Sequence, residues 1–278
     1  MKFSLTILGS SSGVPTASRN TTAHVLNVNE RFFLIDCGEG TQIQFRKFHI
    51  RFGRVHQIFI SHLHSDHILG LFGYLATQTL IGRKKEIDVF GPPDLERFVK
   101  NHFALFPESL VLPVKFHALD PSGAFQIFED KAVEVTSFPV KHRVPTWGFL
   151  FREKLKGRNY EFIKPRSYAF CTDTLFSPEL APFFEGCNLL YHEATYAQKD
   201  ISRAAATFHS TAKQAADIAL LAGAKKLVIG HFSARYKDIS VLVNEARETF
   251  PDTLEAVDGL IIDIPLPAPD PVKSIPFE

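Results

Sequence analysis

The amino-acid sequence predicts an α/β fold in which sheets pack against each other and helices lie outside them. Runs of β-branched and aromatic residues bounded by Gly, Pro and Asn predict many strands, with helical segments between them. The 278 residues are enough for one large core. Hydrophobic residues make up 45% of the chain and charged residues 22%, which disfavours disordered and membrane proteins. No run reaches the roughly 18 apolar residues of a membrane span.

The predicted strands are apolar runs with turn residues at both ends. The opening segment "MKFSLTILGSSSGVPT" lacks the long apolar stretch and the cleavage site of a signal peptide, so it reads as a first strand and turn of a cytoplasmic protein. Later runs repeat this pattern. We expect strands over residues 3–8, 22–28, 31–36, 56–60, 87–90, 132–140, 146–151, 167–172, 188–191, 226–230 and 259–263.

Helices are expected over residues 68–80, 93–103 and 211–222. The last one has the clearest boundaries, because Thr211 and Gln214 have the spacing of a capping box and Gly223 is placed to end the helix. This helix therefore begins directly after His209.

The end of the chain differs from the rest in composition. Residues 265–278 contain five prolines, so we expect an extended tail after a single domain over 1–264. The three cysteines are far apart and odd in number, which predicts buried free thiols. A formal charge of +1 gives no general attraction to polyanions, so any nucleic-acid binding needs a local basic surface.

Residue types that bind metals follow the apolar strands at their carboxyl ends. In layered α/β proteins these ends bring residues that are distant in sequence to one edge. The residues concerned are His62 and His64 after "HQIFIS", His142 after "VEVTSFPVK", Asp173 after "SYAFCT", His192 and Glu193 after "NLLY", and His231 after "KLVIG".

The segment "HLHSDH" predicts two metal ions. His62 and His64 are two residues apart on an extended backbone and can share one cation, whereas the adjacent Asp66 and His67 diverge and suit a second. Imidazole and carboxylate ligands without thiolate suit zinc, and manganese or iron remain possible. The alternative, a polar loop or a histidine satisfied by hydrogen bonds, is the one we apply to the isolated residues His24, His49, His56, His102 and His117.

At these residues the sequence resembles the metallo-β-lactamase superfamily and, within it, ribonuclease Z, the family of tRNA 3′-end endonucleases. The resemblance covers residues 3 to about 240. It rests on the segments "LGSSSGVPTASRNTTA", "LIDCGEGTQIQF", "ISHLHSDHILGL", "KHRVPTWGF", "YAFCTDT", "LLYHEATY", "FHSTAKQAA" and "IGHFSARY", in this order. It implies a four-layer αββα sandwich.

The resemblance also implies a role for each site residue. One zinc ion is held by His62, His64 and His142, the other by Asp66, His67 and His231, and Asp173 bridges them. Hydroxide bound to the metals attacks phosphorus in line, and Asp66 also acts as a base toward the water. His209 protonates the leaving oxygen as general acid. Glu193 either orients His209 or supports a helix end or a ligand. The residues implied to contact substrate are Arg19, Asn20, Ser210 and Arg235.

Two departures from the family bear on the substrate. Bacterial ribonuclease Z usually carries a long arm that grips tRNA, whereas "LFREKLKGRNYEFIKPRS" is enough only for a hairpin. Its six basic residues over 152–166 either contact phosphates or belong to a solvated strand pair. Ala17 stands where the family usually has Lys or Arg, which weakens phosphate contact modestly.

Several functions remain open at this point. The leading hypothesis is a two-metal phosphodiesterase of ribonuclease Z type, acting on tRNA precursors and, by resemblance, as a homodimer. One alternative cleaves small phosphodiesters such as cyclic nucleotides, which need no arm. A thioesterase or lactamase is disfavoured, because acyl hydrolysis has less need of a dedicated proton donor. A binding module without activity is disfavoured because every expected ligand and the acid are present.

Overall fold

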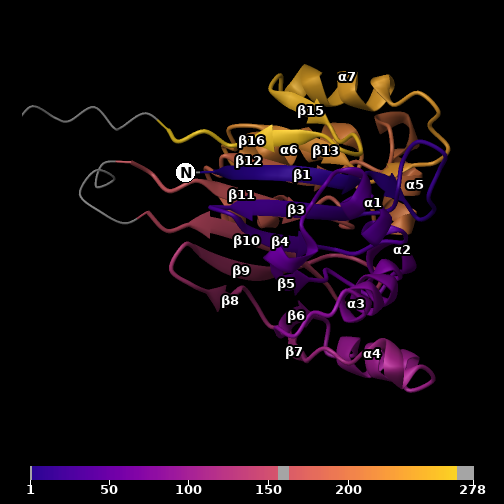
Figure 1. Cartoon of the computed structure of the whole chain (residues 1–278). Coiled ribbons are helices and arrows are strands. Elements are labelled where there is room, and N and C mark those ends of the chain that lie inside the picture. The colour runs from indigo at the N-terminus through magenta and orange to yellow at the C-terminus, as the bar shows by residue number, and fades with distance from the viewer. Residues whose placement is uncertain (1, 156–162, 268–278) are drawn as a thin grey trace, which may run out of the picture.

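Two seven-stranded sheets face each other at the centre of the computed structural model, which describes residues 2–155 and 163–267. Figure 1 shows the sheets side by side, with helices on the outer faces. The first sheet has the order β16 (Ile261–Asp263), β1 (Phe3–Gly9), β3 (Ala23–Val28), β4 (Arg31–Ile35), β5 (Val55–Phe59), β6 (Ile87–Gly91) and β7 (Val114–Ala118). The second has the order β15 (Thr253–Glu255), β13 (Leu227–Gly230), β12 (Leu189–Glu193), β11 (Ser167–Cys171), β10 (Thr146–Glu153), β9 (Val133–Val140) and β8 (Phe125–Glu129).

Helices complete the four layers that the resemblance implies. The first sheet is covered by α1 (Thr41–Lys47), α2 (Ser65–Ile68), α3 (Gly70–Leu80) and α4 (Leu95–Phe103), and their apolar side chains form one core cluster with its outer face. The second sheet is covered by α6 (Ala212–Leu221) and α7 (Ser240–Thr249), while α5 (Ile201–Thr207) lies near the strand ends. A larger cluster fills the space between the sheets and extends under α6 and α7. Short 3₁₀ turns are η1 (Phe52–Arg54), η2 (Pro107–Ser109), η4 (Pro178–Phe184) and η5 (Gln198–Asp200).

The strand directions bring the functional residues to one edge. Strands β4 to β7 are mutually parallel, as are β11, β12, β13 and β15. Strand β9 runs in the same direction as β11, because both are antiparallel to β10. A small bridge between β2 (Ser11–Ser12) and β14 (Phe232–Ser233) joins the ends of β1 and β13 across the two sheets. The residues that follow β5, β9, β11 and β13 therefore lie close together at one edge of the two sheets.

Every predicted strand is present, within two residues at either end. The strands that the sequence did not predict include β7, β8 and β15, which lie at sheet edges, where half-exposed positions carry polar residues and break the apolar run. The predicted helix over 68–80 is present as α2 and α3, which meet at Leu69. The capping box is confirmed, since the Thr211 hydroxyl accepts from the Gln214 backbone and the Gln214 side chain accepts from the Thr211 backbone.

Several smaller predictions have mixed outcomes. All three cysteines are buried free thiols, as expected. No helix among residues 2–155 and 163–267 is both long and apolar enough to cross a membrane. Most of the predicted tail, residues 268–278, lies outside the described part of the chain, so the domain boundary at 264 stays a prediction.

The basic segment over 152–166 is less available to phosphates than its sequence suggested. Arg166 is buried and makes two hydrogen bonds to the Glu153 carboxylate, at 2.7 and 2.6 Å. Arg152 pairs with Glu134 and Lys154 with Glu129. Lys156 and Arg158 lie outside the described residues, and Lys164 is exposed. Arg166 therefore fits neither alternative for this segment, because it is an internal ion-pair partner.

The buried Arg166–Glu153 pair predicts a large effect on stability. Glu153→Gln removes the carboxylate charge that faces the buried guanidinium, so we expect the free energy of unfolding to fall by roughly 3–5 kcal/mol. Glu134→Gln breaks the exposed pair with Arg152 and is the matched control, with an expected loss of about 1 kcal/mol or less. Urea denaturation followed by circular dichroism measures both. Equal losses in the two variants would contradict the buried pair's role.

Candidate metal centre

Seven histidine and aspartate residues converge where the strands of both sheets end. His62 and His64 lie in the loop between β5 and α2, and Asp66 and His67 lie on α2 itself. His142 follows β9, Asp173 follows β11, and His231 directly follows β13. Four separate segments of the chain therefore contribute side chains to one place, as the sequence predicted for these residues.

The first group of ligand atoms comprises His62 Nε2, His64 Nδ1, His142 Nε2 and a carboxylate oxygen of Asp173. His64 Nδ1 lies 3.0 Å from His62 Nε2 and 3.2 Å from His142 Nε2. Asp173 Oδ2 lies 3.5 Å from His62 Nε2 and 3.7 Å from His142 Nε2. Together these four atoms can surround a single ion.

The second group comprises Asp66 Oδ2, His67 Nε2 and His231 Nε2. The two imidazole nitrogens are 3.2 Å apart, and Asp66 Oδ2 lies 3.5 Å from His67 Nε2 and 3.2 Å from His231 Nε2. Asp173 Oδ1 lies 3.3 Å and 3.2 Å from the same two nitrogens. Asp173 thus presents one carboxylate oxygen to each group, which is the geometry of a bridging ligand.

The hydrogen-bond partners of the ligand histidines indicate which ring nitrogen of each is free to bind a metal ion. In four of the ligand histidines, Nδ1 faces away from the centre and lies 2.7–3.0 Å from an oxygen atom. The pairs are His62 with Ser61 Oγ, His67 with Asp36 Oδ2, His142 with the Phe208 carbonyl, and His231 with Thr195 Oγ1. Each of these partners is an acceptor or has its own hydroxyl proton engaged elsewhere. Each Nδ1 therefore carries the hydrogen, and each Nε2 presents a lone pair to the centre.

The spacing of the lone pairs matches a bound cation. Facing lone pairs repel one another unless a positive charge lies between them. Four ligands at about 2.0–2.1 Å from zinc in a tetrahedron lie about 3.3–3.4 Å apart, and the distances in the two groups are 3.0–3.7 Å. Nitrogen and oxygen ligands without sulfur fit zinc and do not exclude manganese or iron.

Asp36 holds the second group in place and is a residue that the sequence analysis did not assign. Its carboxylate accepts hydrogen bonds from His67 Nδ1 at 2.7 Å, the Ser61 hydroxyl at 2.8 Å and the Ser61 backbone at 2.7 Å. Burial raises the pKa of Asp36, although His67 and Ser61 oppose this. Burial lowers the pKa of His67, but the carboxylates of Asp173, Asp66 and Asp36 outweigh it and raise that pKa well above its ordinary value. These carboxylates favour positive charge at Nε2, and a bound cation would take the place of a second ring proton there.

Glu193 lies at the end of β12 and contacts both His209 and the metal-ligand network. Its Oε1 accepts from His209 Nδ1 at 2.9 Å, and its Oε2 accepts from the Thr195 hydroxyl at 2.6 Å. Thr195 Oγ1 also accepts from His231 Nδ1 at 2.9 Å. Burial lowers the pKa of His209, but the charge and hydrogen bond of Glu193 outweigh it and raise that pKa to about 9.

Four turns around the centre adopt left-handed backbone conformations. Asp36, Asp173, Phe208 and His231 have φ angles of 54°, 38°, 58° and 58°. Such conformations cost about 1–3 kcal/mol each in non-glycine residues and are retained where the surrounding contacts enforce them. The chain therefore turns sharply after β4, β11, α5 and β13, which lets the side chains of Asp36, Asp173 and His231 and the carbonyl of Phe208 reach the ligand groups.

The predicted substrate-contacting residues lie around the centre but are already engaged with the protein. Asn20 donates from its backbone and side chain to Asp258, at 2.7 and 2.9 Å, and buried Ser210 donates to the Thr174 carbonyl at 2.7 Å. Arg19 donates to the Tyr236 carbonyl at 3.1 Å. Exposed Arg235 lies over the ring of Tyr196, 5.7 Å from its centroid.

Asp258 fixes the loop that carries Arg19 and Asn20, and the sequence analysis missed it. Besides Asn20, its carboxylate accepts from the Ser10 hydroxyl at 2.9 Å and from the Gln44 side chain at 3.2 Å. The same loop reaches the metal ligands, because the Gly13 backbone donates to Asp66 Oδ2 at 2.7 Å. The only signal in the sequence is a common "DG" turn.

The remaining histidines lie away from the centre. His192 contacts the backbone carbonyl of Glu193 through Nδ1, so it belongs to the strand and not to the ligand groups. The isolated histidines behave as the alternative predicted: His24 bonds Tyr168, His56 bonds Arg83, His117 bonds Asp88, His102 stacks on Phe72, and His49 is exposed.

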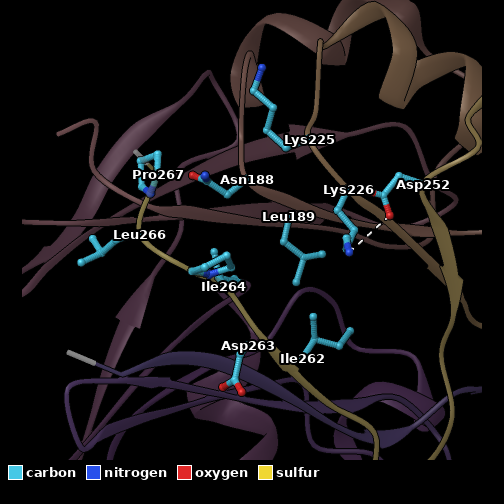
Figure 2. A pocket seen from close by; sticks show the side chains of 11 residues that line it. Asn188, Leu189, Lys225, Lys226, Asp252, Ile262, Asp263, Ile264, Leu266 and Pro267 are labelled. Atoms are coloured by element: carbon cyan, nitrogen blue, oxygen red, sulfur yellow. Dashed lines mark ion pairs between the residues drawn. The ribbon is translucent and has the colours of Figure 1, made fainter. Parts of the chain in front are cut away.

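A separate cavity of about 240 Å³ lies at the opposite ends of the strands. It is formed by the segment after β16 and the beginnings of β12 and β13, and Figure 2 shows the ion pair of Lys226 with Asp252 at its wall. The residues that line it include none of the ligand groups. The cavity is therefore unrelated to the metal centre.

Comparison with known proteins agrees with this geometry. A sequence model of the beta-lactamase superfamily domain matches residues 31–232, so the chain is a member of that superfamily. Ribonuclease Z of Bacteroides fragilis is 40% identical, over 95% of this chain and 99% of its own length. Ribonuclease Z of Parabacteroides distasonis is 38% identical, over 94% and 99%. Within the superfamily, the chain belongs to the ribonuclease Z family.

Solved structures support the same assignment. The short form of human tRNase Z is 31% identical, with a TM-score of 0.79, over 94% of this chain and 99% of that one. The protein YhfI of Bacillus subtilis, at 20% identity and a TM-score of 0.77 over 95% and 100%, shows the shared fold alone. The αββα sandwich expected from the sequence is confirmed.

Proposed function

We propose that this protein is a zinc-dependent endoribonuclease that removes the 3′ trailer from tRNA precursors. The observation that carries the proposal is the placement of Asp173, whose two oxygens face two separate groups of lone pairs at 3.2–3.7 Å. Membership of the ribonuclease Z family supports tRNA as the substrate. When bound, two divalent cations stabilise charge on phosphoryl oxygens and lower the pKa of a water molecule toward neutrality.

The chain's own residues position the reactants and move protons. We assign His62, His64 and His142 to one cation, Asp66, His67 and His231 to the other, and Asp173 to both. Asp66 is also placed to accept a proton from the attacking water, with the Gly13 N–H fixing its carboxylate.

His209 is the proposed general acid. Its Nδ1 hydrogen is engaged by Glu193, which leaves Nε2 for the leaving oxygen. A pKa of about 9 keeps the ring protonated near neutral pH, as proton donation requires. The ring centroid lies 5.1 Å from that of His142 and 5.4 Å from that of His231, so the acid is beside both ligand groups.

One observation favours hydrolysis of small phosphodiesters as a second candidate. Three of the six basic residues of the 152–166 segment, Arg152, Lys154 and Arg166, pair with carboxylates. The alignment with the Bacteroides fragilis relative also spans 302 positions, more than the 278 residues of this chain, so that relative carries insertions.

A homodimer is the proposed assembly. Leu80 and Val111, which lie beside each other through the Val111–Thr79 hydrogen bond, are 84% and 68% exposed. Exposed apolar side chains that lie together are typical of association surfaces. The cytoplasmic location stays a prediction from the sequence.

A direct comparison of substrates tests the proposed function. We expect the zinc-loaded protein to cut a tRNA precursor at its 3′ trailer, and we expect exhaustive chelation to abolish cleavage until zinc is restored. Bis(p-nitrophenyl) phosphate is assayed in parallel by absorbance. Rapid turnover of this small ester with an intact tRNA trailer would replace the proposal with the second candidate.

If His209 is the general acid, a variant without it should still bind both metal ions but cleave phosphodiesters slowly. His209→Ala removes the proposed proton donor without removing a metal ligand, so phosphodiester cleavage should fall about 10²–10⁴-fold while metal content stays at two ions per chain. Single-turnover kinetics and elemental analysis measure the two quantities. The control is His102→Ala, which removes a remote histidine stacked on Phe72 and should retain full activity. Loss of metal from His209→Ala would show that its role is misassigned.

The bridging assignment predicts coupled loss of both metals. Asp173→Ala removes one oxygen from each ligand group, so elemental analysis after dialysis should find both ions depleted together. Asp252→Ala, which breaks a surface ion pair at the far ends of the strands, should keep both ions. Circular dichroism confirms that each variant is folded. Full occupancy in Asp173→Ala would refute the bridge.

A further inference from the structure

A hollow of about 450 Å³ lies directly beside the metal centre. Its wall includes His142, one of the ligand residues, and most of its lining is apolar, with Pro121, Val140, Trp147 and Phe208. A second hollow of about 290 Å³ shares Pro121, Val144, Pro145 and Trp147 with the first, so the two form one continuous trough. The trough leads away from the place where a scissile phosphate would lie.

Phe208 is unusual among the residues of this trough. It has a φ angle of 58°, a conformation that is costly for a bulky side chain, and the residue is 40% exposed. Its backbone carbonyl accepts the hydrogen bond from His142 Nδ1, and any residue at this position can supply that carbonyl. Neither the turn nor the contact to His142 requires a phenyl ring.

The chemistry around the ring suits one kind of ligand. Arg143 is exposed and lines the same hollow beside His142, so a cationic side chain lies next to an apolar surface. Lys141, on the other side of His142, is also exposed and pairs with the Glu179 carboxylate. An RNA strand offers a matching combination, because it carries negatively charged phosphates next to flat, largely apolar bases. Aromatic side chains bind unpaired bases by stacking, and cations contact the phosphates between them.

We propose that the Phe208 ring is a stacking platform for the base of a nucleotide next to the scissile phosphate. This inference rests on the proposed function, because it requires an RNA whose phosphate lies between the ligand groups. The trough continues beyond Phe208, which gives the next nucleotide of the strand a path toward Pro145 and Trp147. Phe208 then contributes to substrate binding and not to the chemical step.

A combined change in protein and substrate tests the proposal. The substrates are a tRNA precursor and two versions with an abasic nucleotide on the 5′ or the 3′ side of the cleavage site. In the wild-type protein, removal of the stacked base should lower kcat/KM by about 5- to 150-fold, and removal of the other base should have a smaller effect. In Phe208→Asn, whose side chain tolerates the left-handed turn, removal of the stacked base should no longer lower kcat/KM more than removal of the other base does. Phe208→Tyr should keep this difference.

A matched control separates stacking from a general loss of aromatic surface. Phe125 lies on β8, is 43% exposed and lines neither hollow, so Phe125→Ala should leave the loss of kcat/KM on removal of the stacked base at its wild-type value. The same penalty in Phe208→Asn as in the wild type would overturn the proposal, as would a wild-type protein that is indifferent to both abasic sites.

A binding measurement keeps this inference separable from the proposed function. Fluorescence anisotropy gives the Kd of the same RNAs carrying a phosphorothioate at the cleavage site, and the same pattern of penalties is expected in Kd. If the wild-type protein leaves tRNA precursors uncut, the proposed function fails, and the anisotropy series alone decides whether Phe208 binds a base. Absence of RNA binding in the anisotropy measurement would overturn both the proposed function and the proposed role of Phe208.

Discussion

The site depends on one buried carboxylate placed between two groups of imidazoles. Burial by itself would raise the pKa of Asp173, but His231, His67 and His62 lower it well below its ordinary value, so the carboxylate is charged. A charged group without solvent is costly unless opposite charge is close, and here both oxygens face ligand groups. The same carboxylate couples the two positions, because one side chain presents an oxygen to each ligand group.

The topology explains how distant residues reach this carboxylate. One sheet contributes the loop after β5, and the other contributes the turns after β9, β11 and β13, so neither sheet contains the complete centre. The β2–β14 bridge joins the sheets at the same edge. Left-handed turns at Asp173 and His231 let the chain leave each strand abruptly, so that these side chains point across the gap. Formation of the centre thus requires both halves of the sandwich to be folded and correctly packed.

The sequence predicted those parts of the site that depend on local pattern. The "HLHSDH" segment lies with His142, Asp173 and His231 as expected, because side-chain alternation and parallel strand direction are local rules that the packing did not override. His192, which also follows an apolar strand, does not join them. Asp36, Thr195 and Asp258 were not found, since each acts through contacts between segments that only the folded chain brings together. The buried ion pair of Arg166 was not found for the same reason: a basic residue in a basic segment gives no sign that its partner is a buried Glu153 on the neighbouring strand.

The position of Glu193 joins the proton donor to the metal ligands. Burial would raise the pKa of Glu193, but the charge of His209 and its hydrogen bond lower it, so the carboxylate stays an acceptor for both of its partners. One oxygen orients His209, and the other orients Thr195, which in turn orients His231. The contacts that correspond to the two roles weighed for Glu193 from the sequence, a hydrogen bond to the proposed acid and a link to a proposed ligand, are thus made by different oxygens of one side chain. The proposed acid and a ligand of the second metal therefore keep a fixed separation, and a displacement of either is transmitted to the other through a single buried group.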